Sequence, residues 1–132
     1  MCENLERITF GAGVKSIGDW AFYNCDNLSE ITIAASVTSI GEFTFAGCSS
    51  LTEITIPNSV TRIGRYAFEG CSSLKIVTFG ENSQITNLSG AFAFCYSLEN
   101  KLTKDGVTDF FNPSIICLVV ITISSTDKKG EI

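Results

Sequence analysis

An eight-residue block recurs along the chain, and its period constrains the fold more than any other feature. The copies read AFYNCDNL at 21–28, TFAGCSSL at 44–51, AFEGCSSL at 67–74 and, more weakly, AFAFCYSL at 91–98. A short block repeated at a fixed period of this length indicates a solenoid of stacked units. We divide the solenoid, residues 1–97, into four repeats, which span residues 5–27, 28–50, 51–73 and 74–97.

When the repeats are aligned, apolar residues of one type fall into the same columns. The clearest columns are the leucines Leu5, Leu28, Leu51 and Leu74 and the phenylalanines Phe22, Phe45, Phe68 and Phe92. One repeat cannot bury its own apolar face, whereas stacked repeats bury a continuous one. The columns therefore predict a core that runs through the stack.

The pattern changes within each repeat. In LTEITI, residues 51–56, apolar and polar residues alternate, which is typical of a half-buried strand. A shorter extended piece, VTRIG, follows at 60–64, and then Ile63, Ala67, Phe68 and Cys71 show the spacing of a short helix. We therefore predict a strand-dominated α/β repeat solenoid with a parallel sheet and short helical or 3₁₀ turns.

Composition excludes several classes of function. The 132 residues contain no histidine, which excludes His-based catalytic pairs and most mixed zinc sites. The net charge is −5 and no lysine or arginine cluster occurs, so we expect no nucleic-acid partner. The longest apolar run, Ile115–Ile123, is shorter than the roughly 20 residues that span a bilayer, and the first residues lack a signal-peptide pattern. We expect no membrane insertion, metal site or cofactor.

Five of the six cysteines are spaced by the repeat, and Cys117 is not. Cys2, Cys25, Cys48 and Cys71 are 23 residues apart, and Cys95 follows after 24. Stacked equivalents would direct their Cβ atoms in parallel into the core, which disfavours disulfide bonds. We interpret the column as a ladder of buried thiols that act as small apolar side chains.

The third repeat carries a motif that resembles a known family. The segment CSSLTEITIPNSVTRIGRYAF, residues 48–68, matches the BspA-type leucine-rich repeat, C-x-x-L-x-x-I-x-I-P-x-x-V-x-x-I-G-x-x-A-F, at every fixed position. The resemblance covers Cys2 to about Leu98. It implies a right-handed parallel solenoid without catalytic activity. It also implies a cell-surface or secreted protein that binds host or matrix proteins in adhesion.

The repeat pattern ends near Leu98, so residues 98–132 form a divergent C-terminal segment. This segment could be a cap whose strand Ile115–Ile123 covers the last repeat, the remains of a membrane anchor, or sequence that does not fold. We favour the cap. Because open solenoid ends expose strand edges, end-to-end self-association is possible.

The outer face of the main strands is our candidate surface for a protein partner. Its side chains vary between repeats while the inward columns stay fixed, and they are Arg7, Thr9, Glu30, Thr32, Glu53, Thr55 and Thr78. An alternative is the aromatic strip Trp20, Phe43 and Tyr66, which we interpret mainly as packing. Glu30 and Glu53 form the only carboxylate pair of interest, but no cleft is expected there, so we predict no enzymatic activity.

Two functions are considered, and the first is what the family resemblance implies. The first is a protein-interaction module of the surface or adhesion type. The second is a purely structural segment of a longer repeat stalk, with no binding of its own.

Overall fold

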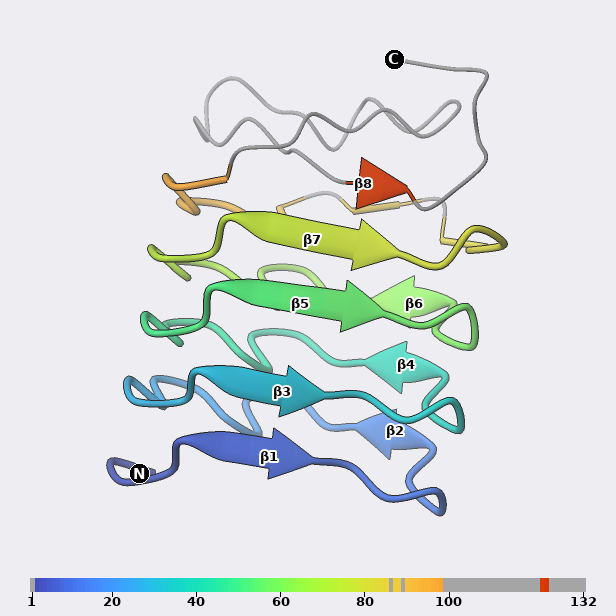
Figure 1. The fold of residues 1–132 in the computed structure, drawn as a ribbon, viewed down its shortest axis with the longest axis horizontal. Coiled ribbons are helices and arrows are strands. Elements are labelled where there is room, and N and C mark those ends of the chain that lie inside the picture. Colours follow the sequence, from blue (N-terminus) through green and yellow to red (C-terminus); the bar gives the residue numbers. More distant parts are fainter. Residues whose placement is uncertain (1, 86, 89, 99–121, 124–132) are drawn as a thin grey trace.

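The computed structural model describes residues 2–85, 87–88, 90–98 and 122–123. The chain winds into stacked coils, and we call the repeats 5–27, 28–50, 51–73 and 74–97 coils 1 to 4 (Figure 1). The strands are β1 (Arg7–Thr9), β2 (Ser16–Ile17), β3 (Glu30–Thr32), β4 (Ser39–Ile40), β5 (Glu53–Ile56), β6 (Arg62–Ile63), β7 (Ile76–Phe79) and β8 (Thr122–Ile123). The strand-dominated repeat solenoid is confirmed.

The strands form two faces. The front strands β1, β3, β5 and β7 stack in chain order, and β2, β4 and β6 stack behind them (Figure 1). Every pair is parallel, and within the four coils the paired residues are equivalent positions of neighbouring coils, as in Ile8↔Ile31 and Ile40↔Ile63. The back strands form one sheet, β2-β4-β6, whereas the front strands form two, β1-β3 and β5-β7-β8.

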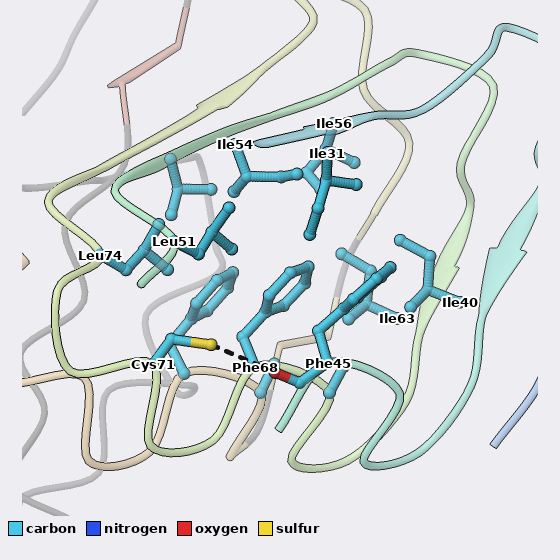
Figure 2. Packing of buried hydrophobic residues seen from close by; sticks show 14 of the residues in the cluster. Ile31, Ile40, Phe45, Leu51, Ile54, Ile56, Ile63, Phe68, Cys71 and Leu74 are labelled. Atoms are coloured by element: carbon cyan, nitrogen blue, oxygen red, sulfur yellow. Dashed lines mark hydrogen bonds between the residues drawn. The ribbon is translucent and has the colours of Figure 1, made fainter. Parts of the chain in front are cut away.

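The inward side chains of both faces build one core. Along β5, Ile54 and Ile56 are buried while Glu53 and Thr55 are exposed, which is the alternation the sequence predicts. The rings of the phenylalanine column stack, with centroids 5.5 Å apart for Phe22–Phe45, 5.4 Å for Phe45–Phe68 and 5.2 Å for Phe68–Phe92. Figure 2 shows Phe45 and Phe68 in line below Ile54 and Ile56. The core therefore runs through all four coils.

The predicted short helical or 3₁₀ turns are not confirmed, because no helix forms within the described residues. In coil 1 the N–H of Ala21 donates to the Gly18 carbonyl, three residues back, but the N–H of Trp20 donates to Glu42 of the next coil. Trp20 has a φ of 61°, a left-handed conformation that a right-handed helix cannot contain. The segment is therefore a series of reverse turns hydrogen-bonded to the neighbouring coil.

Each coil has two left-handed positions in this turn. The first holds Trp20, Phe43, Tyr66 and Gly90, and the second holds Asn24, Gly47, Gly70 and Phe94. Glycine and asparagine adopt this conformation at little cost, whereas aromatic residues do not. Coil 4 exchanges the two residue types, with glycine first and the aromatic residue second.

The interpretation of all repeat cysteines as thiols is wrong for the first two. Cys2 and Cys25 form a disulfide, with Cα atoms 5.1 Å apart. This separation lies in the normal range for disulfides, so side-chain rotation brings the sulfur atoms together despite the parallel stacking of the coils. Coils one period apart are therefore close enough to be cross-linked.

The remaining cysteines of the column follow the prediction. The thiols of Cys48, Cys71 and Cys95 are buried. Each donates to a backbone carbonyl of the preceding coil, with sulfur–oxygen distances of 3.5 Å to Phe22, 3.2 Å to Phe45 and 3.1 Å to Phe68, respectively. Figure 2 shows the Cys71 bond. These thiols therefore combine apolar packing with a hydrogen bond between coils.

Of the divergent C-terminal segment 98–132, the structure describes little beyond β8. This strand pairs with β7, with Thr78 opposite Thr122 and Phe79 opposite Ile123. It covers the edge of β7, where the cap was expected, while the rest of the predicted strand Ile115–Ile123 lies outside the described residues. The division into a solenoid and a cap stays a prediction.

Candidate functional site

The predicted surface lies on the front strands, where alternation turns every second side chain outward. Arg7, Thr9, Glu30, Thr32, Glu53 and Thr55 are exposed, and Thr78 is half-buried. Strand pairing brings equivalent residues together, with Arg7 opposite Glu30, Thr9 opposite Thr32 and Thr55 opposite Thr78. The structure therefore places these side chains on one face, as the sequence predicts.

The charges on this face are only partly compensated. Nε of Arg7 lies 3.3 Å from Oε1 of Glu30, but both side chains are largely exposed. An ion pair this exposed contributes at most about 1 kcal/mol. Glu53 lies opposite Ile76 and has no ion-pair partner among the described residues. The middle of the face is therefore slightly acidic.

A hollow lies on the front between β3 and β5. Its lining includes four residues of the predicted surface, Glu30, Thr32, Glu53 and Thr55. Hydroxyl groups and carboxylates can accept hydrogen bonds and attract cations. Within the part of the chain that the structure describes, no group of three or more potential metal ligands occurs. The arrangement suits polar contacts with a partner.

The alternative aromatic strip lies on the turn that follows the back strands. The rings of Trp20 and Phe43 are stacked with centroids 4.2 Å apart, and those of Phe43 and Tyr66 are tilted at 5.1 Å. The guanidinium of Arg65 lies 5.4 Å from the Tyr66 ring centroid, a cation–π contact. The three rings pack on one another, as the packing interpretation expects.

The sequence analysis missed other exposed aromatic residues on the same turn. Tyr23 packs edge-on against Trp20, and Phe94 packs against Tyr96. Together with Trp20 they are the large hydrophobic side chains that the described residues expose most, at 39% for Phe94 to 66% for Tyr96. Tyr23 and Tyr96 occupy positions where the other coils carry alanine, glutamate, aspartate or serine. These positions do not form an aromatic column, so the alignment of the repeats did not single them out.

Comparison with known proteins places the chain in a family. The family model described as the BspA type leucine-rich repeat region matches residues 1–114 in six copies. A comparison with curated proteins finds no match. Among the described residues, no helix is long and apolar enough to cross a membrane.

Solved structures share the fold. A leucine-rich repeat protein from Eubacterium ventriosum is 26% identical with a TM-score of 0.65, covering 88% of this chain and 32% of that one. The pneumococcal vaccine antigen PcpA is 26% identical with a TM-score of 0.70, covering 92% and 31%. A leucine-rich cell surface protein from Faecalibacterium prausnitzii is 21% identical with a TM-score of 0.53, covering 95% and 61%.

The chain thus spans about a third of the length of the first two structures. The family match covers most of the chain and agrees with the fixed columns, the parallel coils and the shared fold. This protein belongs to the BspA-type leucine-rich-repeat family.

Proposed function

We propose that this chain is part of a right-handed solenoid that binds another protein through the outer face of its front strands, without catalysis. The observation that carries the proposal is the clustering of Glu30, Thr32, Glu53 and Thr55 around one hollow on an exposed face. A solenoid needs uniform residues only where its coils pack, so this face is free to vary with the partner.

The chemistry of the face indicates the kind of partner. Glu53 lacks a compensating charge among the described residues, and the neighbouring threonines offer short, rigid hydrogen-bonding groups. A partner with a basic or polar patch would complement this surface. Because such contacts are electrostatic, binding should weaken as salt is added.

The proposed location is the cell surface or the exterior of the cell, in an adhesion role. Support comes from the family and from two of the similar structures, one named a cell surface protein and one a vaccine antigen. The Cys2–Cys25 disulfide agrees with such a location, because disulfides persist in oxidising compartments.

The test is a binding measurement by surface plasmon resonance against a panel of purified extracellular-matrix proteins. The double variant Glu30→Lys with Glu53→Lys should lose binding and should retain the fold, because both side chains are exposed. The matched control is Trp20→Ala with Tyr66→Ala on the aromatic strip. If the control abolishes binding without unfolding the chain, while the charge reversals leave it intact, the aromatic strip is the recognition surface.

A purely structural segment is the second candidate, favoured by the chain's coverage of only about a third of two similar structures. In that case the chain would bind none of the matrix proteins, and a longer protein containing it would bind through other repeats.

A further inference from the structure

The backbone bonding between coils is interrupted at one place on the front. The N–H of Ser29 donates to Glu6 and that of Lys75 to Thr52, both at 2.8 Å, which links coils 1 and 2 and coils 3 and 4. No corresponding bond joins Thr52 to Ser29, and β3 and β5 belong to different sheets in the described chain. We call this boundary between β3 and β5 the seam (Figure 1).

Other contacts between coils 2 and 3 remain intact. Behind the seam, the sheet β2-β4-β6 is continuous, and next to it the N–H of Thr61 donates to the Thr38 carbonyl at 2.9 Å. On the turn, the N–H of Phe45 donates to Ala67 at 2.7 Å, and the rings of Phe45 and Phe68 stack at 5.4 Å. The two coils are therefore joined at the back and in the core but not at the front.

The sequence supplies one cause for the seam. Glu30 and Glu53 occupy equivalent positions on the two sides, and like charges on facing strands are destabilising.

The hydroxyl group of Ser59 also lacks a contact at the boundary between coils 2 and 3. The Oγ of Ser36 donates to the Val14 carbonyl at 2.7 Å between coils 1 and 2. The equivalent Ser59 Oγ is buried and has no hydrogen-bond partner among the described residues. The separation of coils 2 and 3 therefore extends from the strands into the turn that follows them.

We propose that the seam is a hinge of the solenoid. Coils 2 and 3 swing about the intact back sheet and phenylalanine stack, which opens and closes the front and changes the curvature of the strand face. Opening breaks no backbone bond, because none crosses the seam, and the hollow already admits solvent between the strands. The proposal concerns the isolated chain and does not depend on the proposed partner.

Amide hydrogen exchange measured by NMR provides the first test. Successive residues of a strand direct their N–H groups to opposite neighbours. The carbonyl groups of Thr52 and Ile56 accept hydrogen bonds from coil 4, so both residues direct their backbone groups toward that coil. Thr55 precedes Ile56 and therefore directs its N–H the opposite way, toward the seam. The control is Thr78, which occupies the same column in β7, opposite Thr55 on the paired side. We expect the Thr55 amide to exchange at least about tenfold faster than that of Thr78. Equal protection of the two amides would overturn the proposal.

Cross-linking distinguishes a moving hinge from a fixed gap. The variant Thr32→Cys with Thr55→Cys places cysteines across the seam, and Thr9→Cys with Thr32→Cys places them across the bonded pair β1-β3. The native Cys2–Cys25 bond shows that cysteines one coil apart can form a disulfide. If the seam closes transiently, both variants should cross-link under mild oxidation, as identified by peptide mapping, and the seam disulfide should slow exchange at Thr55. Cross-linking of the control pair alone would show a fixed gap and refute the hinge.

Discussion

The indole of Trp20 lies flat on the ring of Phe43, with an interplanar angle of 11°, although both residues adopt left-handed backbone conformations. That conformation costs an aromatic residue roughly 1–2 kcal/mol, and a stacked ring pair contributes about 0.5–1.5 kcal/mol. The two terms are similar in size. Stacking between coils therefore offsets the backbone cost of an aromatic residue where glycine would be easier to accommodate.

This balance predicts that at Phe43 a glycine variant is more stable than an alanine variant, the reverse of the usual order. Phe43→Ala loses the stack and keeps the left-handed conformation, whereas Phe43→Gly loses the stack and relieves the backbone. The glycine variant should therefore be the more stable by about 1 kcal/mol in urea denaturation. At Thr55, in an ordinary strand, the order should reverse. The same order at both positions would contradict the argument.

Truncation of the phenylalanine stack should be far more damaging. Phe68 is fully buried between Phe45 and Phe92. Phe68→Ala should lower the free energy of unfolding by about 3–5 kcal/mol. Tyr96→Ala, which removes an aromatic ring that is 66% exposed, should cost less than about 1 kcal/mol. If the two variants lose similar amounts of stability in chemical denaturation, the phenylalanine column is not the main part of the core.

The cysteines should divide into two classes when the protein is treated with a thiol reagent. Cys48, Cys71 and Cys95 are buried and should react only after denaturation, while Cys2 and Cys25 should also require a reductant. Peptide mapping by mass spectrometry assigns each site and separates Cys117, which lies outside the described residues. Rapid labelling of Cys71 in the native protein would contradict the buried ladder.

Burial also predicts a loss of stability at alkaline pH. Burial in the core raises the pKa of Cys48 from its ordinary 9.0 to about 12, with a smaller contribution from the Asp26 carboxylate. Between these values the unfolded thiol has lost its proton and the folded thiol keeps it. The unfolded state thus binds fewer protons, so the free energy of unfolding falls as pH rises, by up to about 1.4 kcal/mol per pH unit.

The measurement compares urea denaturation of the wild-type protein and Cys48→Ala at several pH values from about 8 to 11. All other titratable groups are the same in both proteins, so the difference between the two pH profiles reports Cys48. Wild type should lose more stability than the variant above pH 9, the ordinary pKa, and parallel profiles would show that Cys48 does not contribute.

The repeat period predicted the strand register because paired residues, such as Ile8 and Ile31, are one period apart. It did not predict the turn, since the spacing of Ile63, Ala67, Phe68 and Cys71 fits a helix as well as successive turns. Side-chain spacing carries no information on the sign of φ at Tyr66, which separates the two. The Cys2–Cys25 bond was missed because it depends on the distance between the coils and on side-chain rotation.

For the candidate surface, the outward residues were predictable from the sequence, but the hollow between them was not. Alternation along the strands places Glu30, Thr32, Glu53 and Thr55 outward, whatever the details of packing. The hollow they surround was not predictable from the columns, because it depends on a small separation of two coils. The like-charged pair Glu30 and Glu53 was visible in the sequence, but only the structure shows that the front sheet divides between these two residues.

The orientation of the backbone bonds between coils has a mechanical consequence. Bonds such as Trp20 N–H to Glu42 and Thr61 N–H to Thr38 run along the direction in which the coils stack. A force that pulls the two ends of the stack apart would act along these hydrogen bonds. The bonds between one pair of coils could then break before those of the next pair, whereas a force across the bonds would have to break all bonds of a sheet together. Because each coil packs against its neighbours in the stack, extension would proceed in small steps. A protein built this way would yield gradually under tension.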